Sequence, residues 1–317
     1  MSPICRSKRD LCKCADLTRE DVEAILEDAA ELKREWEQGR LRPLLAGKAL
    51  AMIFEKPSLR TRVTFELGMV HLGGHAINLM PSEIGLGQRE SVHDVARNLE
   101  RWCDMIIART FAQNTVDELA HHARIPVINA LSDLEHPCQA LADLLTLREK
   151  FGENLAGFNL TYIGDGNNIC HSLMQLGSLL GINVTVCTPT GYEPLHEIHI
   201  MAEEAARHNG AKLNMVGDPR EAVARAGAVY TDVWASMGQE HEAEHRVRQF
   251  APYQVNAELL AAAPAEVLVM HDLPAHRGEE ITEEVLEGPS CICFDQAENR
   301  LHAQKGLMTF IDAATRH

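Results

Sequence analysis

Residues 49–80 read ALAMIFEKPSLRTRVTFELGMVHLGGHAINLM. Residues 49–56 predict a buried strand, residues 57–74 predict a helix that a glycine pair stops, and residues 75–80 predict a second short strand. A strand, a helix and a strand in succession favour parallel strands with helices packed on the sheet. The predicted helix carries apolar side chains that share one face: Val63, Leu67 and Val70.

The same alternation continues along the chain. Residues 17–39 predict an earlier helix, for which Thr18 is the N-cap and Asp21 completes a capping box. Further strands are expected at 103–109, 125–131, 159–166, 183–189, 212–217, 228–234 and 267–274. Helices are expected at 91–102, 115–123, 136–152, 167–181, 197–210 and 220–226, with a last helix at the end.

The pattern resets after the helix at 136–152, and a chain of 317 residues is long for one core. The prediction is an α/β fold of two doubly wound parallel-sheet domains, with a ligand cleft between the carboxyl ends of their strands. The first domain is expected over 1–140 and the second over 141–300, with residues 301–317 packing back on the first.

Composition excludes several classes of protein. A net charge of −16 argues against nonspecific nucleic-acid binding, so any anion site must concentrate positive charge locally. No apolar run reaches the ~18 residues of a membrane span, and the polar start MSPICRSKRDLCKC is unlike a secretory signal, which favours a cytoplasmic protein. The nine cysteines are irregularly spaced without C-x-x-C, which argues against a disulfide framework or a zinc site.

The segment FEKPSLRTR (54–62) brings hydroxyls and arginines to the start of a helix. Backbone N–H groups there are donors without helical partners, so the segment is either an ordinary capped helix or a cradle for an anion. Arg109 closes one predicted strand, and His136 and Gln139 follow another. Because parallel strands end at one edge of a sheet, these side chains are expected on the same rim, which favours the cradle.

Polar residues also follow the strands of the second half. IGDGNN (163–168) suggests dinucleotide binding, but Ile169 replaces the third glycine and no acidic residue closes the next strand, so the signal for NAD is weak. DVWASMG (232–238) and HDLPAHRG (271–278) end two further strands, and ENR (298–300) is expected to precede the last helix.

FEKPSLRTR, HPCQALAD, IGDGNN, DVWASMGQE, HDLPAHRGEE and AENR occur in this order over residues 54–300. Together they resemble the aspartate/ornithine carbamoyltransferase family, with DVWASMG typical of members that use ornithine. The resemblance implies transfer of a carbamoyl group from carbamoyl phosphate to the δ-amine of L-ornithine, with no metal or redox cofactor. It also implies a homotrimer, or a multiple of trimers, with active sites near subunit interfaces.

The resemblance assigns roles to individual residues. It implies that Arg109, His136, Asp272 and Arg300 act in the chemistry. Carbamoyl phosphate would be held by Ser58, Leu59, Arg60, Thr61, Arg109, His136, Gln139, Leu273 and Arg300, with Gly85 or Gln88 reaching across a subunit interface. Ornithine would be held by Asn168, Asp232, Ser236 and Met237.

Three positions depart from the family pattern. Leu59 stands where S-T-R-T-R has a hydroxyl, so it offers only its backbone N–H, and Gly85 aligns with a polar residue of the family, with Gln88 three positions on. Asp272 replaces the cysteine of H-C-L-P, close to the reacting amine. A carboxylate there is expected to raise the pKa of the amine and so oppose its deprotonation.

Three alternatives stay open. A carbamoyltransferase could use another acceptor, such as putrescine or an acylated ornithine, because Asp272 alters the acceptor site. A dehydrogenase of the Rossmann type would build on IGDGNN. A non-catalytic relative would keep the phosphate-binding residues without forming citrulline.

Overall fold

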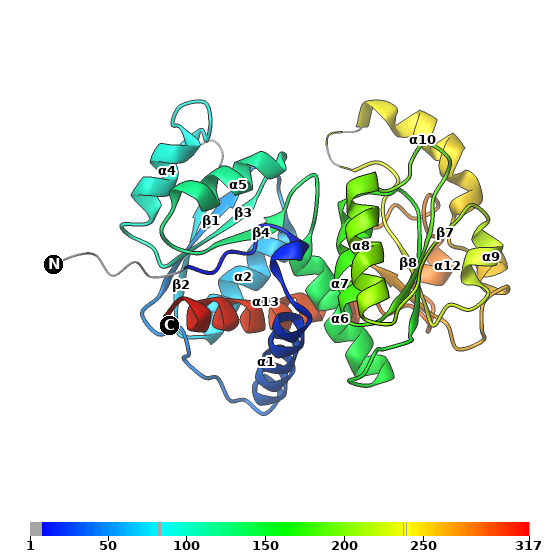
Figure 1. Ribbon diagram of the computed structural model, residues 1–317, viewed down its shortest axis with the longest axis horizontal. Helices are drawn as coiled ribbons and strands as arrows, with labels where there is room; N and C mark the ends of the chain where they lie inside the picture. The colour runs from blue at the N-terminus through cyan, green and yellow to red at the C-terminus, as the bar shows by residue number, and fades with distance from the viewer. Residues whose placement is uncertain (1–7, 81–83, 237, 239, 317) are drawn as a thin grey trace. The chain divides into compact units, whose positions relative to one another are not determined.

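The structure is a computed structural model that describes residues 8–80, 84–236, 238 and 240–316 (Figure 1). The chain forms two compact units. Unit 1 comprises residues 1–145 and 299–317, and unit 2 comprises residues 146–298.

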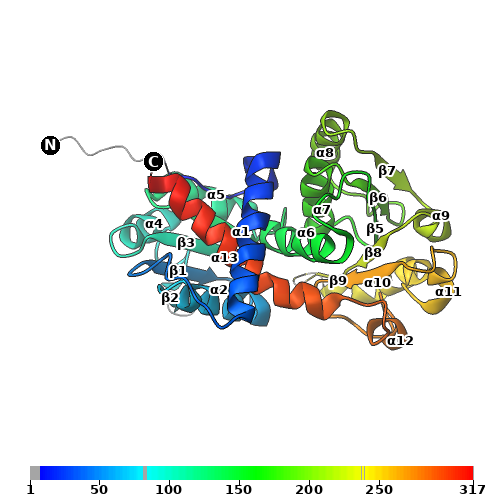
Figure 2. The same cartoon turned by 90° about the horizontal axis from the view of Figure 1, so that it is seen from below.

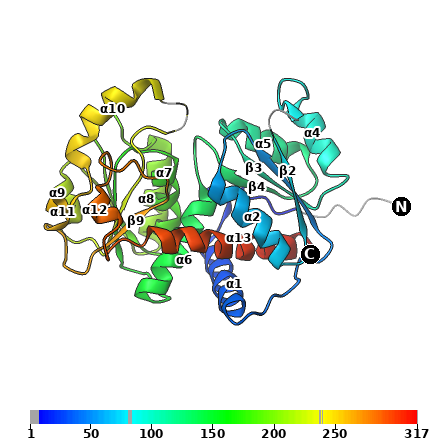
Figure 3. The same ribbon diagram turned by 180° about the vertical axis from the view of Figure 1, so that it is seen from behind.

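Unit 1 is built on a parallel sheet in the order β2-β1-β3-β4. Its strands are β1 (Ala49–Phe54), β2 (His75–Leu79), β3 (Met105–Arg109) and β4 (Val127–Leu131). Strands β3 and β4 are buried along their whole length, because helices cover both faces of the sheet. Helices α4 (Val92–Leu99) and α5 (Gln113–His122) lie on one face, and α1 (Arg19–Glu37), α2 (Leu59–His71) and α13 (Cys293–Arg316) on the other (Figures 1 and 3).

Local chemistry sets several of these boundaries. Thr18 Oγ1 accepts the Asp21 N–H at 3.2 Å, and Asp21 Oδ2 accepts the Thr18 N–H at 2.9 Å, which confirms the predicted capping box of α1. Helix α2 ends before Gly73, whose φ of 79° suits glycine. Helix α6 (Pro137–Phe151) follows β4 and is likewise closed by Gly152 at φ 98°.

The apolar face predicted for α2 exists but points outward. Val63, Leu67 and Val70 are 41%, 42% and 57% exposed, whereas the helix buries the side that carries Thr61, Phe65, Gly68 and Met69. Periodicity locates a shared face, but only packing decides which face meets the sheet.

Helices α1 and α13 cross closely in unit 1 (Figure 2). A Cβ at Gly306 of α13 would lie 2.5 Å from the Ile25 carbonyl oxygen and 2.8 Å from the Ala29 nitrogen of α1. The glycine is therefore what permits the two backbones to approach.

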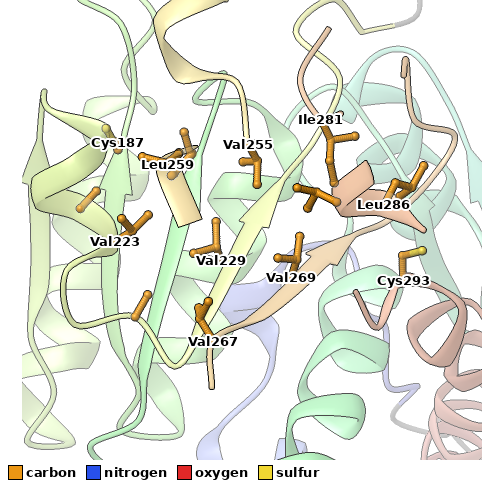
Figure 4. Close-up of a cluster of buried hydrophobic side chains, with 14 residues drawn as sticks. Cys187, Val223, Val229, Val255, Leu259, Val267, Val269, Ile281, Leu286 and Cys293 are labelled. Atoms are coloured by element: carbon orange, nitrogen blue, oxygen red, sulfur yellow. The ribbon is translucent and has the colours of Figure 1, made fainter. Parts of the chain in front are cut away.

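Unit 2 has a five-stranded parallel sheet in the order β7-β6-β5-β8-β9. Its strands are β5 (Asn159–Ile163), β6 (Asn183–Cys187), β7 (Leu213–Val216), β8 (Ala228–Thr231) and β9 (Leu268–His271). Helices α7 (Asn168–Leu179) and α8 (His196–His208) cover one face, and α9 (Pro219–Val223), α11 (Ala257–Leu260) and α12 (Glu283–Leu286) the other (Figures 1 and 2). On the second face Val229 and Val269 of the sheet pack with Val223, Leu259 and Leu286 (Figure 4).

The remaining elements are short. They are the 3₁₀ turns η1 (Cys14–Asp16), η2 (Glu240–Glu242) and η3 (Ala251–Tyr253), and helix α10 (Ala243–Phe250). The predicted fold class, α/β with two doubly wound parallel sheets, is confirmed. Among the described residues, no helix has the length and the apolar character needed to cross a membrane.

One predicted boundary is wrong. Helix α13 begins at Cys293, so Glu298 and Arg300 lie inside it and do not precede it. Its first turns are held by unit 2, where Gln296 Oε1 accepts the His271 N–H at 2.9 Å. This tertiary contact has no local signal in the sequence.

Candidate functional site

In each parallel sheet there is one point from which strands are added toward both edges, so the connections on its two sides lead in opposite directions. In unit 1 this point lies between β1 and β3, and in unit 2 between β5 and β8. Loops diverge at such a point and leave a crevice at the carboxyl ends of the strands. The predicted site residues Arg109 and Asp232 lie at these ends, Arg109 closing β3 and Asp232 following β8.

The start of helix α2 forms the floor of the site in unit 1. Ser58 is its N-cap, and the Ser58 hydroxyl accepts the Thr61 N–H at 3.2 Å. The helix N-terminus supplies backbone donors and partial positive charge, which suits a phosphate. Leu59 is 74% exposed, so its apolar side chain points to solvent and does not cover the backbone N–H groups at the helix start.

Arg300 reaches this floor from α13. It is 2% exposed, its Nη1 donates to Gln139 Oε1 at 2.6 Å, and its Nη2 donates to Thr61 Oγ1 at 3.0 Å. Gln139 is held in turn, because its Nε2 donates to Asp143 Oδ1 at 2.8 Å. Residues from α2, α6 and α13 are thus joined in one buried hydrogen-bonded group.

His136 lies beside this group, just before α6, and is 2% exposed. Burial lowers the pKa of His136 well below its ordinary value, and the positive charges of Arg300, Arg109 and Arg60 lower it further. The imidazole is therefore neutral at physiological pH. Three arginines around a neutral imidazole form a concentrated positive site in a chain whose net charge is −16.

Gly85 and Gln88 line a pocket of about 590 Å³ in unit 1, together with Phe54, Glu55 and Phe111. Gly85 has φ 55°, and a Cβ there would lie 2.7 Å from Arg89 Cβ, so the turn requires glycine. The pocket adjoins Lys56, whose ammonium lies 4.6 Å from the centre of the Phe111 ring. Sequence reasoning did not single out Phe111, because this aromatic residue belongs to none of the motifs.

In unit 2, Asn167 caps α7 and links two loops. Its Oδ1 accepts the N–H groups of Ile169 and Cys170, and its Nδ2 donates to Asp232 Oδ2 at 2.7 Å. Asp232 is 6% exposed, and its Oδ1 also accepts the Val233 N–H at 2.7 Å. The sequence prediction chose Asn168, the neighbouring residue, whose Oδ1 lies 3.0 Å from the Ile169 nitrogen. The sequence signal for Asn167 was the N-cap position itself.

Asp272 follows β9 and lies close to Asp232. Donor atoms of Asp232, His271 and Asp272 all lie within 4.8 Å of one another. His271 Nδ1 already accepts the Leu273 N–H at 2.9 Å, and its Nε2 lies 3.0 Å from Glu280 Oε1. Because the Nδ1 lone pair is used, this cluster fits a cationic amine better than a metal ion. His271 ends β9 and Glu280 lies nine residues further on; both are fully buried, and this separation without a motif is why they were missed as a positioning pair.

An ion pair between Arg246 and Asp165 holds the neighbouring loops of unit 2. Arg246 of α10 donates to Asp165 Oδ2 at 2.9 Å and to the Trp234 carbonyl oxygen at 2.9 Å. Burial raises the pKa of Asp165 to about 6, although the Arg246 charge opposes that rise. Arg246 thereby fixes the loop between Trp234 and Ser236, and Ser236 is half-buried there. Met237, the last residue predicted to hold ornithine, lies outside the described residues.

The glycines of IGDGNN have a structural explanation. A Cβ at Gly166 would lie 2.3 Å from the Pro194 nitrogen and 2.7 Å from the Tyr192 carbonyl oxygen. The chain itself fills the space that a pyrophosphate would need beside this glycine. The local geometry therefore disfavours dinucleotide binding at this motif.

The sequence matches two family profiles. Residues 9–149 match the carbamoyl-P binding domain of aspartate/ornithine carbamoyltransferase, and residues 156–311 match its Asp/Orn binding domain. The chain belongs to the aspartate/ornithine carbamoyltransferase family. The two matches within this family cover both units, with the change from one to the other between residues 149 and 156.

Individual family members are similar over nearly the whole chain. An ornithine carbamoyltransferase of Halalkalibacterium halodurans is 52% identical over 301 residues, which cover 95% of this chain and 94% of the relative. An anabolic ornithine carbamoyltransferase of Pyrococcus furiosus is 49% identical over 303 residues, 96% of each chain. A solved structure of ornithine carbamoyltransferase from that organism has a TM-score of 0.92 at 50% identity, covering 95% of this chain and 96% of that one.

Proposed function

We propose that this protein transfers the carbamoyl group of carbamoyl phosphate to the δ-amine of L-ornithine and releases L-citrulline and phosphate. The observation that carries the proposal is the group of Arg60, Arg109 and Arg300 around a buried, neutral His136 at the start of two helices. Such a group is suited to a small, highly charged anion with a carbonyl. Arginine biosynthesis is the accompanying metabolic role, in keeping with the anabolic relative.

For the donor, we assign the phosphate to Ser58, Arg60, Thr61 and the backbone N–H of Leu59. Support comes from the helix N-terminus and its Ser58 cap. We assign Arg109 to bridge the phosphate and the carbonyl oxygen. This role requires a cation at the end of β3, and Arg109 is buried there.

For the carbamoyl end, we assign His136, Gln139, Arg300 and the backbone of Leu273. A neutral His136 can donate one hydrogen bond to the carbonyl oxygen without adding charge to the site. Arg300 is oriented by Gln139 and Thr61, so its guanidinium needs no rearrangement to polarise the carbonyl. Gly85 or Gln88 is proposed to reach the phosphate site of a neighbouring subunit.

For the acceptor, we assign Asn168, Asp232, Ser236 and Met237 to the amino-acid end of ornithine and Asp272 to its amine. Two neighbouring carboxylates attract ammonium groups, and Asn167 orients one of them. In the reaction the neutral δ-nitrogen bonds to the carbamoyl carbon, the C–O bond to phosphate breaks, and the nitrogen loses its proton. Orientation of both substrates and cationic stabilisation of the developing oxyanion lower the barrier.

We also propose that unit 1 serves as the carbamoyl-phosphate domain and unit 2 as the ornithine domain, in a homotrimer or a multiple of trimers. The outward apolar face of α2 with Val63, Leu67 and Val70 supports self-association. Light scattering coupled to size exclusion measures the oligomer, and a monomer at micromolar concentration would contradict it.

The test is an assay of phosphate and citrulline with carbamoyl phosphate and a panel of amines. The panel contains L-ornithine, putrescine, N-acetylornithine and L-aspartate. Citrulline formation with ornithine at the highest kcat/KM is expected. Activity with another amine only would replace the acceptor assignment, and phosphate binding without any product would indicate a non-catalytic relative.

A further inference from the structure

Two cysteines lie outside the substrate residues, on either side of Ile292 where the chain enters α13. The backbone around them is tied to β9: the Ile292 N–H donates to the Val269 carbonyl at 2.9 Å, and the Val269 N–H donates to that of Ser290 at 2.8 Å. The Cys291 N–H donates to the Gly288 carbonyl at 3.1 Å. The positions of both side chains are therefore set by the fold.

The two cysteines are two residues apart, pack in the same core cluster and differ in access. Cys293 is 1% exposed and packs in the core with Val269 and Leu286 (Figure 4), whereas Cys291 lies at the edge of that core and is partly exposed. Cys291 can therefore meet a solute, whereas Cys293 lies in the core two residues further on.

The pKa values of the two thiols are shifted in opposite directions. The hydrogen bond from Cys293 lowers the pKa of Cys291, although burial opposes the effect, and the same bond raises the pKa of Cys293. Burial raises the pKa of Cys12, Cys138 and Cys187 to about 12. Because the thiolate is the reactive form, Cys291 is favoured over these other thiols.

We propose that Cys291 and Cys293 form a hydroperoxide-reactive pair that closes to a reversible disulfide. The Cys291 thiolate attacks the O–O bond, which forms a sulfenic acid and releases one water from hydrogen peroxide. The Cys293 sulfur attacks that sulfenic sulfur, the S–S bond forms, and a second water leaves. Two thiols lose two electrons to one peroxide, and an external thiol returns them.

The test uses the reduced full-length protein, treated with hydrogen peroxide, alkylated with iodoacetamide and digested with trypsin. Residues 278–300 contain no internal Lys or Arg, so both sulfurs fall in one peptide. The expected product is this peptide lacking two hydrogen atoms and both alkyl groups, restored by prior dithiothreitol. Full double alkylation at peroxide doses that oxidise another cysteine of the chain would overturn the proposal.

Matched variants separate the two roles. Cys293→Ser should leave a sulfenic acid on Cys291 that dimedone traps, with no disulfide. Cys291→Ser should leave Cys293 unoxidised at the same dose, since the buried thiol loses its entry point. Equal oxidation of Cys293 in wild type and Cys291→Ser would contradict the order of attack. Cys293→Ala gives a second variant of the buried position, and thermal melting verifies that each protein is folded.

Discussion

At the scale of single residues, Asp272 stands where the resemblance to the family predicts a cysteine. Its carboxylate lies near Asp232, in a group whose donor atoms are within 4.8 Å. Two negative charges stabilise a bound ammonium, yet only the neutral amine can attack. In its proposed role, the side chain that favours binding of the acceptor therefore opposes its activation.

We predict that Asp272→Cys moves the pH profile of kcat at saturating ornithine to lower pH. Removing the carboxylate lowers the pKa of the bound amine, so the neutral fraction at a given pH rises. A shift of about one pH unit corresponds to about 1.4 kcal/mol. Steady-state rates from pH 6 to 10 measure it. Asp272→Asn keeps the shape without the charge and should shift likewise, and superimposable profiles would refute the argument.

Arg300 gives a second prediction at this scale. Arg300→Lys keeps the charge but cannot bond both Gln139 and Thr61 in the same planar geometry. We expect kcat to fall by about 10²–10³ through loss of oriented carbonyl polarisation. Turnover at saturating substrates measures the change, with circular dichroism as the folding control. A variant with unchanged kcat would assign Arg300 a purely structural role.

At the scale of elements, the contact between α1 and α13 determines how the C-terminal helix packs in unit 1. Helix α13 holds Arg300, and its approach to α1 depends on Gly306. Lys305, next to it, is 1% exposed and donates to the Leu32 carbonyl at 3.2 Å. The crossing of α1 and α13 therefore contains both a close backbone contact at Gly306 and the buried ammonium of Lys305.

Gly306→Ala is predicted to destabilise the protein by about 1–3 kcal/mol, because the added Cβ would press on the α1 backbone. Urea unfolding measures the loss. The control is Gly217→Ala, where a Cβ meets no atom within 4 Å. Equal stability of the two variants would mean that α1 can move aside freely.

Lys305 predicts a pH dependence of stability. Burial lowers the pKa of Lys305 from its ordinary value to about 8, so between pH 8 and about 10.4 the unfolded chain binds more protons. Its contribution to stability is therefore unfavourable below pH 8 and is relieved as the pH rises. Lys305→Met should raise the urea midpoint at pH 7.5 more than at pH 9.5. A constant difference between the proteins would contradict this.

The elements also show how far periodicity reaches. Strands β1 to β9 were predicted from apolar runs. Inner strands such as β3 and β4 are buried along their whole length and so have a continuous local signal, whereas the edge strands β2 and β7 are partly exposed. The start of α13 was not, since a bond from His271 to Gln296 holds it. The exposure of the apolar face of α2 was not predicted either, because an apolar stripe does not indicate what it will contact.

At the scale of the whole molecule, donor and acceptor groups belong to different compact units. Arg60, Arg109, His136 and Gln139 lie in unit 1, joined by Arg300 from the end of the chain. Asp232 and Asp272 lie in unit 2. The cations proposed to bind carbamoyl phosphate and the carboxylates proposed to bind ornithine thus belong to separate compact units.

This division predicts separable kinetic effects. Thr61→Val, which removes a hydroxyl bonded to Arg300, should raise KM for carbamoyl phosphate about tenfold with little change for ornithine. Asp232→Asn should raise KM for ornithine and leave that for carbamoyl phosphate. Initial rates over a grid of both substrates measure the two constants. Equal changes in both constants for either variant would argue against separate subsites.

The sequence by itself determined the class of fold, the helix start at Ser58 and the family, because periodicity and short motifs are local properties. Only the tertiary structure decided that Arg300 bonds Thr61 across 239 residues, that Asn167 holds Asp232, and that His136 is neutral. The reason is physical: a pKa and an oriented hydrogen bond depend on desolvation and on charges that the fold brings together from distant parts of the chain.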